Sequence, residues 1–88
     1  MFEYVLKHGW SIKPSEKKNK KYDVYKDGKY ILSFGDKRYQ HYKDFFGYYK
    51  KLNHLDEKRR ISYRKRAEGI GKLGDPYSSN FWAYNFLW

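Results

Sequence analysis

The sequence contains no cysteine, which excludes disulfide bonds and thiolate metal ligands as sources of stability. Its three histidines (His8, His41 and His54) have no familiar metal-ligand spacing, so we expect no metal. No apolar run approaches the roughly 18 residues that a membrane-spanning helix needs. The N-terminal segment MFEYVLKHGW has an acid, Glu3, and no cationic start before an apolar stretch, so we expect neither a signal peptide nor a membrane partner.

Acidic residues are scarce, because 10 Asp and Glu stand against 20 Lys and Arg, and the formal net charge is +10. Such a charge on a polar chain would normally indicate disorder. Aromatic residues argue against disorder: they form 23% of the 88 residues, and each ring can bury a large area with few rotatable bonds. We therefore expect one folded domain over residues 1–88, near the small end of domain sizes, with a core built from rings.

The region from Lys21 to Phe34, KYDVYKDGKYILSF, has the clearest secondary-structure pattern in the chain. Two alternating runs of strand formers flank Asp27-Gly28, which predicts a hairpin. An earlier alternating segment, Phe2 to His8, predicts a first strand that ends at Gly9. Between these strands, residues 13–21 are rich in lysine and predict a solvated loop.

The register of the hairpin can be argued from charge and from side-chain alternation. A two-residue turn would place Lys26 opposite Lys29, with like charges facing each other. A three-residue loop with a left-handed Gly28 pairs Tyr25 with Lys29 instead. We prefer this bulged register because it gathers one apolar face, formed by Tyr22, Val24, Tyr30, Leu32 and Phe34.

Two helices are predicted after an aperiodic stretch at 34–54. The first covers about residues 56–67, with Asp56 as its N-cap and Gly69 or Gly71 at its end. It is basic, and one stripe gathers Leu52, Leu55, Arg59, Tyr63, Ala67 and Ile70. The second lies in the aromatic segment SSNFWAYNFLW, which is too apolar to be free and packs either on the sheet or on a partner; its candidate caps are Ser78, Ser79 and Asn80. The fold class is therefore α+β, a small antiparallel sheet of about three strands packed by these helices.

The positive charge is concentrated in the middle of the chain. Residues 37–66 contain 11 Lys and Arg against 3 Asp and Glu, a net of +8. A face of this kind attracts polyanions, and the interleaved tyrosines offer rings on which unpaired bases stack. The exposed set expected to contact nucleic acid is Lys37, Arg38, Lys43, Lys58, Arg60, Arg64, Lys65 and Arg66.

The stretch GDKRYQHYKD, residues 35–44, also contains two acids, which a pure phosphate-binding surface would not need. We therefore expect Asp36 and Asp44 to accept hydrogen bonds from helix arginines such as Arg59 or Arg60. Residues assigned to structure rather than to binding are Asp36, Tyr39, Asp44, Arg59, Tyr63, Trp82 and Trp88. His41 and His54 are expected to be hydrogen-bonded structural residues.

These motifs together resemble a family of small basic proteins of unknown function from large DNA bacteriophages and giant DNA viruses. The resemblance covers about residues 20–88 and departs at Ala67, where the family usually has a histidine. It implies that the protein is of viral origin and is located in the host cytoplasm or the virion, but it implies no mechanism. The matching positions are Gly35, Tyr39, Tyr42, Lys43, Asp44, His54, Asp56, Arg59, Arg60, Tyr63, Arg66, Phe86, Leu87 and Trp88.

The predicted function is that of a virus-encoded nucleic-acid-binding protein, of DNA or RNA, acting through the basic helix and the preceding loop. An alternative is a virion structural or assembly protein that binds an acidic protein surface, with the aromatic C-terminal segment as its anchor. A host-takeover inhibitor is a third possibility. No enzymatic activity and no cofactor are expected, because GIGKLG (69–74) lacks the spacing of a phosphate-binding loop, and His54 with Asp56 lacks a nucleophile.

Overall fold

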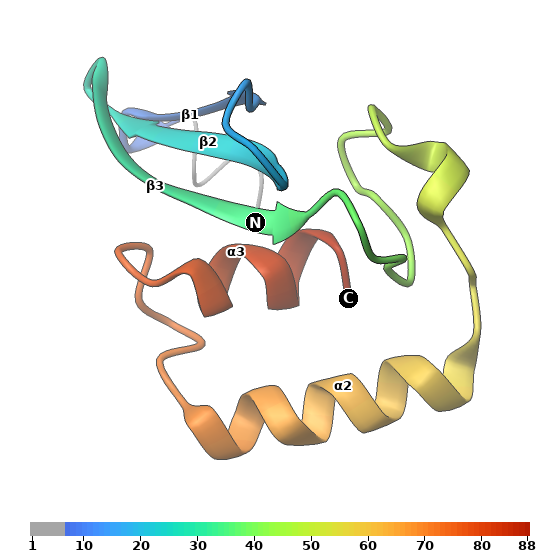
Figure 1. Cartoon of the computed structure of the whole chain (residues 1–88). Coiled ribbons are helices and arrows are strands. Elements are labelled where there is room, and N and C mark those ends of the chain that lie inside the picture. Colours follow the sequence, from blue (N-terminus) through green and yellow to red (C-terminus); the bar gives the residue numbers. More distant parts are fainter. Residues whose placement is uncertain (1–6) are drawn as a thin grey trace.

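A computed structural model describes residues 7–88 and confirms the α+β class. Three antiparallel strands form one sheet in the order β1-β2-β3. Figure 1 shows α3 under this sheet and α2 on the other side of α3. The elements are β1 (Trp10–Pro14), β2 (Lys20–Lys26), β3 (Lys29–Asp36), the 3₁₀ turn η1 (Lys50–Leu52), α2 (Glu57–Ile70) and α3 (Ser79–Phe86).

Within residues 7–88 the first strand is β1, which lies later in the chain than the strand that the sequence pattern predicted. Most of the predicted strand, Phe2 to His8, lies outside the described residues, and Lys7 and His8 are not in a strand. Strand β1 instead begins at Trp10, just after Gly9, which has a φ of 83°. It pairs with β2 from Trp10–Lys26 to Pro14–Tyr22. The predicted loop therefore shrinks to residues 15–19.

The hairpin uses the two-residue turn, so the predicted bulged register is wrong. Lys26 lies opposite Lys29, and Asp27 and Gly28 both have positive φ (50° and 83°). A turn of this kind matches the right-handed twist of the strands. The facing charges are separated because the Lys26 ammonium turns back and donates to the carbonyl of His8.

A bulge does occur, but between Val24 and Tyr25 rather than at the turn. Because of this bulge, four of the five residues predicted to share an apolar face still do so: Tyr22 lies opposite Phe34, and Val24 lies opposite Leu32. Tyr30 is the exception: it lies opposite Tyr25 and is 45% exposed.

The aromatic C-terminal segment belongs to the core. Ser78 caps α3, as one of the three predicted candidates, by accepting from the Asn80 backbone N–H. Trp82 is fully buried, with its ring centroid 5.5 Å from that of Trp10 and 6.1 Å from that of Phe34. The buried cluster consists of Trp10, Tyr22, Val24, Phe34, Phe81, Trp82, Phe86 and Leu87. The proposal that this segment is an interface anchor is therefore wrong for its buried residues.

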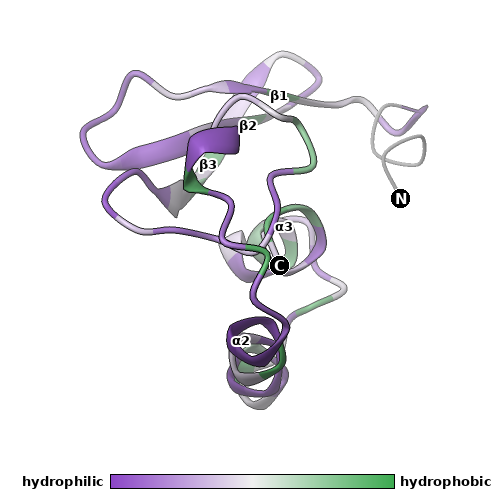
Figure 2. Ribbon diagram, turned by 90° about the vertical axis from the view of Figure 1, so that its right-hand side faces the viewer, coloured by the Kyte–Doolittle hydropathy of each residue, from purple (hydrophilic) through white to green (hydrophobic). Residues whose placement is uncertain are grey.

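Helix α2 begins as predicted and extends three residues beyond 67. Asp56 accepts hydrogen bonds from the backbone N–H groups of Lys58 and Arg59, and Gly71 follows the last helical residue. Of its side chains only Ala67 is buried, and Ile70 is 75% exposed, so the predicted apolar stripe does not face the core along its whole length. Figure 2 shows why: α2 lies below α3, which separates it from the sheet.

Candidate functional site

An open groove of about 740 Å³ lies between the end of β3 and helix α2. One wall comes from β2, β3 and the loop that follows, the other from α2, and α3 with the chain end forms the floor. Its lining is Lys20, Lys21, Ser33, Phe34, Gly35, Asp36, Tyr39, Gln40, Arg59, Tyr63, Arg66, Ile70, Ser79, Asn80, Ala83, Leu87 and Trp88.

The α2 wall of this groove is one stripe of the helix. Arg59, Tyr63, Arg66 and Ile70 are spaced four, three and four residues apart, which places them on a single face. Tyr63 is partly buried and stacks on Trp88, with ring centroids 4.3 Å apart and planes 11° apart. Burial raises the pKa of Tyr63. Two guanidinium groups thus flank an aromatic pair.

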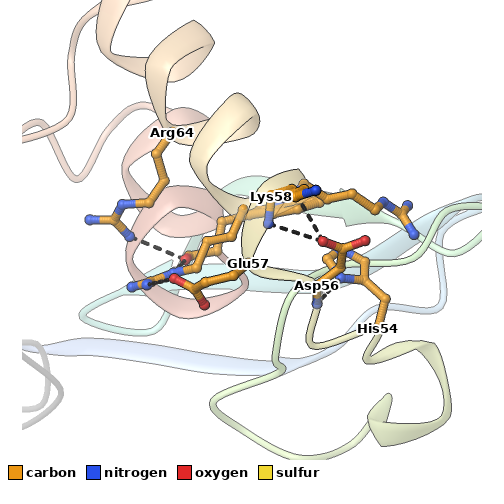
Figure 3. A network of polar contacts seen from close by, with 8 residues as sticks. His54, Asp56, Glu57, Lys58 and Arg64 are labelled. Atoms are coloured by element: carbon orange, nitrogen blue, oxygen red, sulfur yellow. Dashed lines mark hydrogen bonds and ion pairs between the residues drawn. The ribbon is translucent and has the colours of Figure 1, made fainter.

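The adjoining face of α2 holds the helix in place. Arg60 Nε and Arg64 Nη1 donate to the main-chain oxygen of Trp88, at 2.8 and 3.1 Å, and Arg60 also pairs with Glu57 at 3.0 Å. Figure 3 shows Arg64 and Glu57 converging on this region beside the Asp56 cap. Arg60 and Arg64 were predicted to be exposed contact residues, but both are partly buried and attach α2 to the chain end.

Further polar contacts join α2 to α3. The Asn80 side-chain N–H₂ donates to the carbonyls of Ala67 and Gly71, at 3.2 and 2.8 Å. The Tyr84 hydroxyl donates to Glu68 at 2.9 Å, and the Arg64 guanidinium lies 4.0 Å from the Tyr84 ring centroid. Because these partners are 9 to 20 residues apart, no short-range sequence pattern pointed to them.

The predicted pairing of Asp36 with a helix arginine is wrong. Asp36 instead accepts from its near neighbour Arg38, at 2.8 Å from Nη2 and 3.1 Å from Nε. The hydrogen bonds from Arg38 lower the pKa of Asp36 to about 2. Arg59 donates to Gln40 Oε1 at 2.9 Å, across the end of the groove. Tyr39 was assigned to the core, yet it is 63% exposed at the groove wall.

The predicted pairing of Asp44 with a helix arginine is also wrong, although Asp44 is a buried residue with a structural set of hydrogen bonds. Its carboxylate is buried and accepts from the Tyr22 hydroxyl and from the backbone N–H groups of Phe46 and Tyr49, at 2.9 and 2.8 Å for the last two. Burial and the bond to Asp44 raise the pKa of Tyr22. Asp44 therefore ties the irregular loop to the sheet.

Beside it lies a buried amine that the sequence analysis did not single out. Lys21 Nζ donates to His41 Nδ1 at 2.7 Å, and His41 Nε2 donates to Asn53 Oδ1 at 2.6 Å. This assigns the neutral tautomer with its proton on Nε2. Burial lowers the pKa of Lys21 to about 8, despite the nearby Asp44, and it also lowers the pKa of His41, with Lys21 as the next cause. The expectation of a hydrogen-bonded, structural His41 holds.

His54 is also hydrogen-bonded, as expected, because its Nδ1 accepts from the Asp56 backbone N–H at 2.9 Å. Its ring lies 5.1 Å from that of Trp88. Burial, and then the charge of Arg59, lowers its pKa.

These histidines predict a loss of stability in mild acid. In the unfolded chain His41 takes up a proton near pH 6.5, whereas in the folded protein its pKa is lower. The free energy of unfolding is therefore highest above about pH 6.5 and falls as the pH is lowered below it. Each unit by which the pKa is lowered is worth about 1.4 kcal/mol. Urea unfolding at about pH 7.5 and about pH 5 measures the decrease. His54 contributes in the same direction.

His41→Gln should reduce this pH dependence, because glutamine keeps a donor and an acceptor but does not titrate. The matched control His8→Gln, at an exposed histidine, should leave it unchanged. Equal unfolding free energies of the wild type at the two pH values would contradict the assignment.

The cations of the predicted binding set fall into two groups. Four are engaged: Arg38 with Asp36, Arg60 and Arg64 with Trp88, and Lys37, which donates to the Ser15 carbonyl at 3.0 Å. The others are exposed, and within residues 7–88 no ion pair or hydrogen bond joins their charged groups to another residue; they are Lys43, Lys58, Lys65 and Arg66. Arg59, expected to be structural, joins Arg66 in the groove.

Comparisons with family models, with curated proteins and with solved structures find no match for this chain. The resemblance to viral basic proteins therefore stays a prediction. Within residues 7–88, no helix has the length and apolarity to cross a membrane, and no three His, Asp or Glu side chains are grouped to hold a metal ion.

Proposed function

We propose that the protein binds nucleic acid through the phosphate backbone, with α2 as its main contact surface. The observation that carries this proposal is the division of charge on α2. Two arginines fix the helix to the chain end, while Lys58, Arg59, Lys65 and Arg66 remain exposed on its other sides. A rigid helix with exposed cations is suited to phosphate contacts, which need positive charge held in register with the polymer.

The charge of the rest of the chain supports the same reading. The net charge is +10, and two acids near the exposed α2 cations are paired, Asp36 with Arg38 and Glu57 with Arg60, while Glu68 accepts from the Tyr84 hydroxyl. Helix α2 is 14 residues long, which corresponds to about 21 Å, enough to follow several phosphates. With six Lys and Arg against two Glu, the helix remains strongly positive for a polyanion.

Binding is expected to weaken steeply with salt, because each phosphate contact releases a counterion. Replacing Lys58, Lys65 and Arg66 together with glutamine should make this dependence shallower: the negative slope of log affinity against log salt should decrease in magnitude by about 2 to 3. Fluorescence anisotropy of a labelled oligonucleotide, titrated at several salt concentrations, measures this slope.

The matched control removes the same charge from elsewhere, with glutamine at Lys7, Lys18 and Lys29, which are exposed and remote from α2 in the chain. It should change the slope by less than the α2 variant. Arg60 and Arg64 are unsuitable for this test, because replacing them disturbs the attachment of α2. Absence of binding at low salt would refute the proposal and leave an acidic protein surface as the partner to be sought.

A further inference from the structure

We infer that the groove between β3 and α2 holds an unpaired nucleotide segment, so that the protein prefers single-stranded nucleic acid to a duplex. This inference rests on the proposed function, and it adds the form of nucleic acid and the residues that select it. The occupant we commit to is one strand, with its phosphates at the rim and a base between the walls.

The charge of the groove fits a polyanion. Arg59 and Arg66 lie on its α2 wall, seven residues apart, which is about 10 Å along the helix axis. Lys20 lies on the opposite wall and is exposed. The acid in the lining, Asp36, is already paired with the Arg38 guanidinium, which donates two hydrogen bonds to it. Phosphates at the rim therefore meet cations from both sides.

The rings of the groove fit a base. Tyr39 lies on the loop wall with 63% of its surface exposed, and among the exposed rings of residues 7–88 it is the one that lines the groove. On the other side Tyr63 and Trp88 form a stacked pair that lines the groove. Stacking on such rings tolerates any base, because every base has a flat face.

Hydrogen-bonding groups for base edges also line the groove. Among residues 7–88, the Gln40 side-chain N–H₂ and the Asn80 side-chain oxygen have no partner, although the other atom of each amide is bonded. One is a donor and the other an acceptor. A base in a duplex is already paired and stacked, so it cannot present its edges and faces to these groups. Only an unpaired base can enter.

The experiment compares oligothymidine, oligouridine and a duplex of the same length, by anisotropy at one low salt concentration. We expect tighter binding of the single strands. Tyr39→Ala should weaken single-strand binding roughly tenfold or more while leaving duplex binding unchanged. The control Tyr48→Ala removes an equally exposed tyrosine (67%) that does not line the groove, and should have little effect.

A second readout is intrinsic fluorescence. Trp88 lines the groove, whereas Trp10 and Trp82 are buried, so a stacked base should quench Trp88 and the quench should be lost in Trp88→Phe. Equal affinity for strand and duplex, with no effect of Tyr39→Ala, would overturn the groove assignment and leave phosphate binding by α2 intact. Failure of every oligonucleotide to bind would instead overturn both.

Discussion

Trp82→Ala is expected to remove a large part of the stability of the domain, at a cost of about 3–5 kcal/mol. A domain of this length has an unfolding free energy of about 4–13 kcal/mol in total. Trp82 is fully buried and its ring lies within 6.1 Å of four others, those of Trp10, Phe34, Phe81 and Phe86. Its removal leaves a cavity where sheet and α3 meet, and the Pro76 carbonyl loses the donor that now lies 2.8 Å away. Urea unfolding followed by circular dichroism measures the loss.

The control for this experiment is Trp82→Phe, which keeps an aromatic ring and loses only part of the volume and the indole N–H. It should cost less than half as much as the alanine variant. A Trp82→Ala protein with a wild-type unfolding midpoint would show that α3 does not form the core. The arrangement of sheet and helix would then be wrong.

Asp44→Ala should destabilise the protein by about 3–5 kcal/mol, because one carboxylate satisfies three donors in a buried site. The variant leaves the Tyr22 hydroxyl and the N–H groups of Phe46 and Tyr49 without their acceptor. It also removes the negative charge that partly offsets the burial of the Lys21 ammonium. Thermal and urea unfolding measure the effect, and Asp44→Asn should be intermediate because it retains one acceptor oxygen.

Asp36→Ala is the matched control, since both acids belong to the same ten-residue stretch. Asp36 pairs with Arg38 at the surface, and exposed pairs of this kind contribute about 0–1 kcal/mol. The two variants should therefore differ clearly in unfolding midpoint. Similar midpoints would mean that the loop is not held by Asp44.

Local signals in the sequence located the hairpin turn and the helix ends, although the register predicted for the hairpin was wrong. Asp27-Gly28 makes the turn, Asp56 and Ser78 cap the two helices, and Gly71 ends α2. Each of these devices acts within about four residues, so its residue types are visible together. The α+β class followed from these elements, and the aromatic composition pointed to a core of rings.

The tertiary structure decided which charges are free. Lys58 and Arg60 look alike in the sequence, yet one is exposed and the other binds the Trp88 oxygen, 28 residues away. Asp36 and Asp44 likewise differ only through their surroundings. These charges differ because a hydrogen bond between distant residues depends on how α2, α3 and the loop pack together. That packing is determined by the burial of the aromatic core.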